Sequence, residues 1–120
     1  MRIAIVDDIA SERTLLRDRL EQQLGRRGVH ADLTEFENGE TFLKAAKERP
    51  FTVLFLDIYM DGANGIEIAR ELRGFDPDCL LIFTTTSTDH ALDGFKVRAQ
   101  HYLVKPYNEK EISELMDEVL

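Results

Sequence analysis

The most informative segment of the chain is FTVLFL, residues 51–56, which is almost entirely apolar and is followed directly by Asp57. Strands of an antiparallel sheet commonly alternate apolar and polar residues, because one face of such a sheet meets water. An apolar run of this length instead indicates a strand of a parallel sheet that is covered on both faces. The segment therefore predicts a buried β-strand with a carboxylate at its carboxyl end.

Four further segments have strand character, and helical patterns separate them. These strands are expected at residues 2–6, 29–36, 79–83 and 101–104. Ser11 and Asn108 precede two of the helices as candidate N-caps, and Gly25 and Gly28 are expected to end the first helix. Strands that alternate with helices predict an α/β fold: a five-stranded parallel sheet with helices on both faces. For five such units we expect the flavodoxin-like strand order 2-1-3-4-5.

Length and charge limit the classes of function. The 120 residues suffice for one domain, and they carry 15 basic and 23 acidic side chains, a net charge of −8. This balance argues against direct binding of nucleic acid or of an anionic membrane. Cys79 is the single cysteine, so an intramolecular disulfide is excluded and a cytoplasmic location is expected. We expect no signal peptide, and no apolar run approaches the roughly 18 residues of a membrane span.

Polar side chains follow four of the expected strands. Asp7 and Asp8 follow the first, Asp57 the third, threonines 84–86 the fourth and Lys105 the fifth. The carboxyl ends of parallel strands meet at one edge of a sheet, so we expect these groups to lie together. Three carboxylates favour a hard cation such as Mg²⁺, and a lysine beside them can meet an anion. Each feature also has a simpler interpretation, as a helix cap, strand material or a solvated lysine, and the pattern alone does not select one threonine.

The chain resembles the receiver domains of two-component response regulators. The resemblance rests on residues 3–8, 57–65, 83–85 and 102–106, and it extends over essentially the whole chain. Residues 59–67 and residues 91–95 with 99–106 are similar to regulators that carry a C-terminal LytTR-type DNA-binding domain. We therefore expect residues 1–120 to form one receiver domain.

The resemblance implies a site that takes up a phosphoryl group. Asp57 would accept this group from a sensor histidine kinase, and Mg²⁺ would be held by Asp7, Asp8, Asp57 and the backbone carbonyl of Tyr59. A carboxylate is a suitable nucleophile for phosphoryl transfer, and cations catalyse it by balancing the charge of the transition state. The protein would then be no enzyme in the usual sense, because it would catalyse only its own phosphorylation and dephosphorylation.

The resemblance also implies a switch. Lys105 and Thr85 would contact the phosphoryl group, Tyr102 would be the switch aromatic residue, and Pro106 would follow a cis peptide bond. Movement of Thr85 would let Tyr102 rotate and change the surface of the fourth helix, fifth strand and fifth helix. This surface is a candidate face for a phosphorylation-dependent homodimer.

Two positions distinguish this chain within the family it resembles. Asp61 stands where the family usually has proline, so the loop after Asp57 is expected to be less restrained. Tyr59 and Ser87 occupy the positions that would orient a hydrolytic water, and neither is a carboxylate or an amide. We therefore expect slow to moderate loss of the phosphoryl group.

Several alternatives stay open. The chain ends at Leu120 inside the apolar pattern of the last helix, which favours a piece of a longer protein whose output domain lies outside it. A stand-alone receiver that acts through protein contacts is the main rival. A haloacid-dehalogenase-like phosphatase fits poorly, because it needs a second aspartate where this chain has Tyr59. A flavodoxin-type electron carrier also fits poorly, because Asp7 and Asp8 occupy the place of its phosphate-binding loop.

Overall fold

The computed structural model describes residues 1–60, 63–87 and 91–120, so Asp61 lies outside the described residues. Its elements, in chain order, are β1 (Arg2–Val6), α1 (Ala10–Arg27), β2 (Asp32–Phe36), α2 (Gly39–Glu48), β3 (Val53–Asp57), β4 (Tyr59–Met60), β5 (Ala63–Asn64), α3 (Gly65–Arg73), β6 (Leu80–Thr85), α4 (Ala91–Lys96), β7 (His101–Val104) and α5 (Glu109–Val119).

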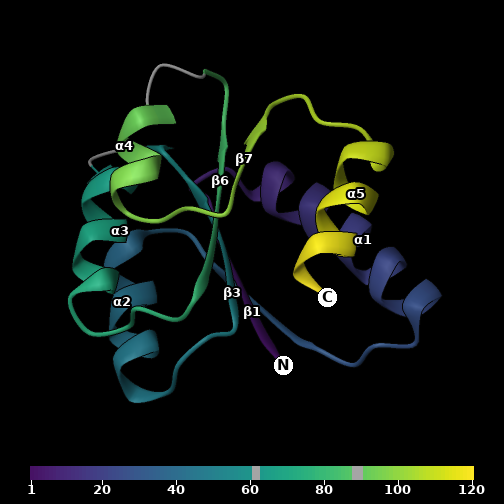
Figure 1. Cartoon of the computed structure of the whole chain (residues 1–120), viewed down its shortest axis with the longest axis horizontal. Helices are drawn as coiled ribbons and strands as arrows, with labels where there is room; N and C mark the ends of the chain where they lie inside the picture. The colour runs from purple at the N-terminus through teal and green to yellow at the C-terminus, as the bar shows by residue number, and fades with distance from the viewer. Residues whose placement is uncertain (61–62, 88–90) are drawn as a thin grey trace.

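Five of the strands form one parallel sheet in the order β2-β1-β3-β6-β7. When these five strands are numbered by themselves, the order is 2-1-3-4-5, so the predicted flavodoxin-like topology is confirmed. The helices cover both faces of the sheet: α2, α3 and α4 lie on one side, and α1 and α5 lie on the other (Figure 1).

The central strand β3 explains why residues 53–57 are apolar almost throughout. It pairs with β1 on one side and β6 on the other, and all five of its residues are buried. Successive side chains of a strand point to opposite faces of the sheet. Leu54 and Leu56 accordingly pack into the core under α2 and α3, whereas Val53 and Phe55 pack into the core under α1 and α5.

Asparagine side chains begin three of the helices. The side chains of Asn38, Asn64 and Asn108 accept hydrogen bonds from backbone N–H groups in the first turns of α2, α3 and α5, at 2.9, 2.8 and 2.8 Å. Such a bond satisfies one of the N–H groups that a helix start leaves without a partner. The prediction that Asn108 caps the last helix is confirmed.

The first helix begins differently from the prediction. It starts at Ala10, before Ser11, and its N-cap residue Ile9 makes no side-chain cap. The Oδ1 atom of Asp7 instead accepts a hydrogen bond from the Ile9 N–H at 2.9 Å. The helix also continues through Gly25 and ends at Gly28, whose φ of 64° is the left-handed conformation that glycine adopts readily.

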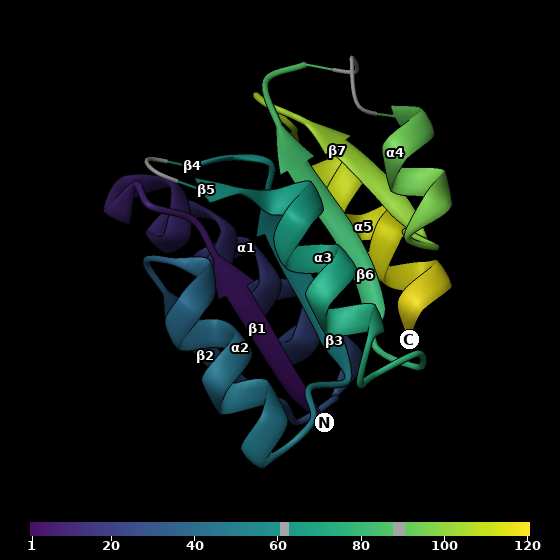
Figure 2. The same ribbon diagram turned by 90° about the vertical axis from the view of Figure 1, so that its left-hand side faces the viewer.

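The remaining differences concern short segments. Strand β2 begins at Asp32, later than the expected start at residue 29. Strand β6, the fourth predicted strand, extends to Thr85, beyond the expected end at residue 83. The two-residue strands β4 and β5 form an antiparallel hairpin that was not predicted. This hairpin lies beyond the carboxyl end of β3 and leads into α3 (Figure 2). No helix in the described ranges is both long and apolar enough to cross a membrane.

Candidate functional site

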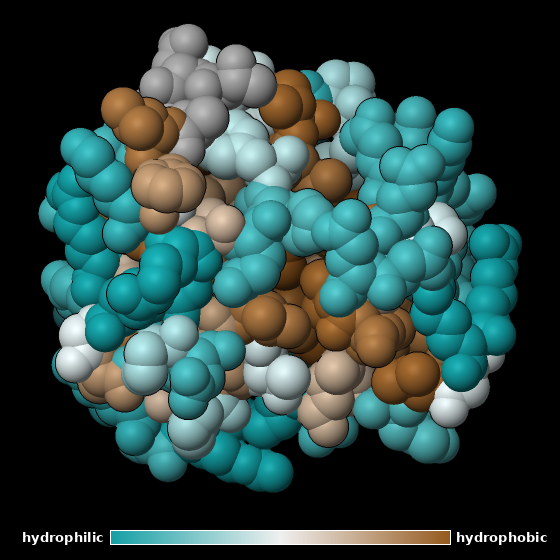
Figure 3. Space-filling view, in the orientation of Figure 1, coloured by the Kyte–Doolittle hydropathy of each residue, from teal (hydrophilic) through white to brown (hydrophobic). Residues whose placement is uncertain are grey.

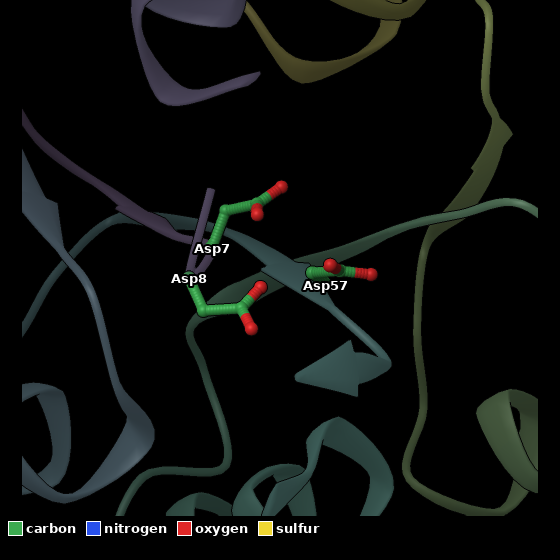
Figure 4. Close-up of side chains that lie close together, drawn as sticks. All are labelled: Asp7, Asp8 and Asp57. Atoms are coloured by element: carbon green, nitrogen blue, oxygen red, sulfur yellow. The ribbon is translucent and has the colours of Figure 1, made fainter. Parts of the chain in front are cut away.

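Three carboxylates meet at the carboxyl ends of two neighbouring strands. Asp7 and Asp8 follow β1, and Asp57 is the last residue of β3, with which β1 pairs directly. One carboxylate oxygen from each of the three lies within 4.8 Å of the others. Figure 4 shows the side chains of Asp7 and Asp8 extending from the segment after β1 on the side that faces Asp57. The sequence-based prediction that these three residues lie together therefore agrees with the geometry.

Lys105 brings a positive charge to the same site from the segment directly after β7. Its Nζ atom lies 2.8 Å from Asp7 Oδ2 and 3.5 Å from Asp57 Oδ2, and its side chain is only 10% exposed. The backbone N–H of Lys105 donates to the carbonyl of Thr85 at 2.6 Å, and the peptide bond to Pro106 is cis, as the resemblance implies. Lys105 is thus held at the end of the sheet, with its ammonium group directed at the carboxylates.

The charges of the site shift the proton affinities of its members. Burial raises the pKa of Asp57 to about 6; the charge of Asp7 adds to this rise, while Lys105 opposes it. For Lys105, burial alone lowers the pKa, but its hydrogen bond to Asp7 and the nearby carboxylate charges outweigh burial and raise it. The single ammonium group of Lys105 does not fully balance the negative charges of the buried carboxylates, so the pKa of Asp57 stays raised. A bound cation would favour the ionised form of Asp57.

The donor set is suited to a hard cation. All the side-chain donors of the described cluster are carboxylate oxygens. Magnesium binds through a few carboxylates and keeps several of its water molecules, so Asp7, Asp8 and Asp57 fit it. The backbone N–H of Tyr59 donates to Asp57 Oδ1 at 3.2 Å, which places that peptide beside the cluster. The carbonyl of Tyr59 as a further ligand stays a prediction.

Of the residues expected to form the switch, Thr85 ends β6 and Tyr102 lies within β7. Thr85 is fully buried, and its Oγ1 atom accepts a hydrogen bond from the N–H of Ser87 at 3.4 Å. The hydroxyl of Tyr102 donates to the carbonyl of Ser87 at 2.9 Å, and its ring lies 6.0 Å from that of Phe83. Thr85 and Tyr102 therefore both bond to the backbone of Ser87, a connection that sequence reasoning did not anticipate.

Other residues at the site were missed or left without a role. Glu12 lies 3.8 Å from the ammonium group of Lys105. The guanidinium group of Arg13 donates to the carbonyl of Asp7 at 2.7 Å and forms an ion pair with Glu35 at 3.3 Å. Gly65 approaches the backbone of Asp57 so closely that a Cβ atom there would stand 2.3 Å from the Asp57 carbonyl oxygen. Of these residues, only Gly65 lies in a segment that carries the family resemblance, residues 57–65.

Comparisons with known proteins agree with this geometry. Residues 3–117 match the family model of the response regulator receiver domain. The sensory transduction protein LytT of Oceanobacillus iheyensis is 34% identical over 99% of the chain, and the transcriptional regulatory protein LytR of Staphylococcus aureus is 28% identical over 99%. The chain spans about half the length of these curated relatives, 48% and 47%.

Solved structures show the same similarity. The response regulator protein TrrA from Thermotoga maritima, in complex with Mg²⁺-BeF, is 30% identical, with a TM-score of 0.83. That match covers 99% of this chain and 98% of the other. The chemotaxis protein CheY4 of Vibrio cholerae shares the fold with a TM-score of 0.81 at 24% identity.

Proposed function

The chain belongs to the response regulator receiver domains, and on that premise we propose that it is a phosphorylation-activated signalling switch whose acceptor is Asp57. Asp7, Asp8 and Asp57 are the proposed ligands of Mg²⁺, together with the carbonyl of Tyr59. The observation that carries the proposal is the convergence of three carboxylates and one buried ammonium group at the ends of β1, β3 and β7. Residues 1–120 are proposed to form one receiver domain.

The geometry supports nucleophilic attack by Asp57. A carboxylate oxygen of Asp57 forms a bond to phosphorus while the bond from phosphorus to the imidazole of the kinase histidine breaks, and the imidazole leaves with the electron pair. When bound, Mg²⁺ supplies positive charge that stabilises the negative oxygens of the transferring group. Lys105 supplies further positive charge, because its ammonium group already lies 3.5 Å from Asp57. Asp7 orients this lysine through the shorter contact of 2.8 Å.

The acceptor is tested with a small phosphodonor. Incubation with Mg²⁺ and acetyl phosphate is expected to add one phosphoryl group, which intact mass spectrometry detects. Asp57→Asn should abolish the adduct, because the amide is a poor nucleophile. Asp18→Asn changes an exposed aspartate on α1 and should leave the adduct unchanged. A full yield of adduct in Asp57→Asn would refute the assignment.

The proposed output is a change of the surface formed by α4, β7 and α5, here called the output surface. Exposed apolar side chains lie on it, namely Leu92, Phe95 and Val104. Figure 3 shows apolar surface over α4 and in a band near the C-terminal end of α5.

We propose that Thr85 moves toward the phosphoryl group and that Tyr102 follows through their shared partner Ser87. Sedimentation of the phosphorylated and unphosphorylated protein tests whether the output surface forms a homodimer; identical coefficients would count against it.

Membership in the receiver-domain family also supports a proposal about the proteins with which this chain interacts. A cytoplasmic sensor histidine kinase is the proposed phosphodonor. Because the chain spans about half of LytT and LytR, a C-terminal output domain of the LytTR type, outside this sequence, is the proposed target of the switch. A stand-alone receiver is the alternative. The phosphatase alternative is not favoured, because Tyr59 stands where a second carboxylate would be needed.

A further inference from the structure

Glu12 is a carboxylate near Lys105 that is not one of the three carboxylates of the proposed metal site. Glu12 is in the first turn of α1, and its Oε2 atom lies 3.8 Å from the Nζ atom of Lys105. The side chain of Glu12 is 33% exposed and that of Lys105 is 10% exposed. Glu12 therefore stands at the rim of the site, whereas the lysine is inside it.

Lys105 faces three carboxylates, and metal binding is expected to change its attraction to two of them but not to the third. Asp7 and Asp57, at 2.8 and 3.5 Å, belong to the cluster that is proposed to bind Mg²⁺. A bound cation balances their charges and weakens their hold on the lysine. Glu12 lies outside that cluster, so its attraction for Lys105 persists when the metal is bound.

Glu12 also has space into which it can draw the lysine. Both residues line a surface hollow of about 280 Å³ between α1 and the segment after β7. Thr86 and Pro106 form other parts of its wall. The ammonium group of Lys105 thus lies between two regions, the carboxylate cluster on one side and the hollow with Glu12 on the other.

We propose that Glu12 is a positioning residue that restrains Lys105 and slows phosphoryl transfer to Asp57. This inference rests on the proposed function. Glu12 and the incoming phosphoryl group are both anions, and they compete for one ammonium group. Part of the attraction between Lys105 and Glu12 is lost when the lysine turns to the phosphoryl group. That loss raises the barrier to transfer, so removal of the Glu12 charge accelerates the reaction.

A simpler role for Glu12 gives a different result. An acidic residue in the first turn of a helix interacts favourably with the helix dipole. Under this role, loss of the charge lowers the stability of α1 and leaves phosphoryl transfer unchanged. Measurement of transfer therefore separates the two roles.

The test compares rates with acetyl phosphate at saturating Mg²⁺, followed by intact mass. Glu12→Gln keeps the shape of the side chain and removes its charge. We expect it to accelerate adduct formation about two- to fivefold, the size expected when one partly exposed ion pair is lost. Glu21→Gln is the matched control, because Glu21 lies on the same helix and pairs with Arg17 at 3.1 Å, not with the site. It should leave the rate unchanged.

A double-mutant cycle shows whether Glu12 acts through the lysine. In a Lys105→Met background, Glu12→Gln should leave the slower rate unchanged, because the restrained group is absent. Equal acceleration in both backgrounds would mean that Glu12 repels the anionic donor directly, and would overturn the proposal. Unchanged transfer in a folded Glu12→Gln protein, checked by thermal unfolding, would also overturn it. Absence of any adduct in the unmodified protein would instead refute the proposed function.

Discussion

Asp57 holds its charge in unfavourable surroundings. Burial raises its pKa to about 6, against an ordinary value of 3.8, so in the absence of a divalent cation ionisation costs folding free energy. The sign follows from proton linkage: the folded state retains this proton better than the unfolded state, so the contribution of Asp57 to stability falls as pH rises from about 4 to about 6.

This predicts a stabilising substitution at Asp57, the proposed acceptor. In the presence of EDTA at pH 7, Asp57→Asn should raise the free energy of unfolding by on the order of 1 kcal/mol, after allowance for solvent screening. At pH 4.5 the gain should largely vanish, because folded Asp57 is then protonated. Urea unfolding at both pH values measures the difference. An equal gain at both would contradict the direction of the pKa shift, and Asp18→Asn serves as the control.

Asp7 shows how far a sequence can define a site at the residue scale. The position of Asp7 after a strand predicted two roles, as a helix cap or as a metal ligand. The structure gives its two oxygens different partners, Ile9 N–H and the Lys105 ammonium group. Strand ends are predictable because topology brings them together. The contact between Glu12 and Lys105 depends on how α1 and the segment after β7 pack, and no local pattern encodes that packing.

At the scale of elements, the junction between β3 and α3 depends on close packing of backbone. A Cβ atom on Gly65 would stand 2.3 Å from the carbonyl oxygen of Asp57 and 2.8 Å from the Cα atom of Ile58. Both neighbours are backbone atoms, so the strand or the helix must shift. Gly65→Ala should therefore cost about 2 kcal/mol of stability and slow phosphorylation by displacing Asp57.

Gly25 provides the matched comparison. It lies inside α1, where an added Cβ atom would meet nothing within 4 Å. Gly25→Ala should stabilise the protein by about 0.5–1 kcal/mol, because alanine loses less backbone freedom in a helix. Denaturant unfolding of the two variants tests both expectations; a loss of stability in Gly25→Ala, or none in Gly65→Ala, would contradict them.

The helix caps give a second prediction at this scale. The side chain of Asn108 accepts a hydrogen bond from Glu111 N–H at 2.8 Å, so Asn108→Ala should cost about 1 kcal/mol. Ser11→Ala should be nearly neutral, because α1 begins before Ser11 and uses no side chain of its own N-cap residue. Thermal unfolding of both variants provides the measurement, and equal losses would contradict the observed start of α1.

Elements were predictable where a periodic pattern was long enough. The apolar run of β3 and the amphipathic helices determined the fold class and the strand order. The hairpin of β4 and β5 was missed because two residues per strand carry no period. The start of α1 was placed wrongly because its N-cap residue, Ile9, makes no side-chain cap; Asp7 instead accepts a hydrogen bond from the backbone N–H of Ile9, just before the helix.

At the scale of the whole molecule, the proposed metal binding should be linked to folding. The proposed ligands come from β1 and β3 and converge only in the folded chain. A metal concentration a hundred times the dissociation constant should therefore stabilise the protein by about 2.7 kcal/mol. Thermal unfolding with and without Mg²⁺ measures this shift. Asp8→Asn should lose most of the shift and Asp18→Asn should keep it; a full shift in Asp8→Asn would remove Asp8 from the proposed ligands.

The strand order also determines when the site can exist during synthesis. β1 leaves the ribosome first. One of its two partner strands, β3, follows much later, because Ile3 of β1 pairs with Val53, which lies fifty residues further along the chain. Until β3 is made, one edge of β1 has no paired strand, and Asp7 and Asp8 lie without Asp57, the third carboxylate of the cluster. Lys105 arrives later still, with β7 at the opposite edge of the sheet. The proposed acceptor site therefore cannot assemble in a nascent chain before residue 105 has emerged and β7 has joined the sheet.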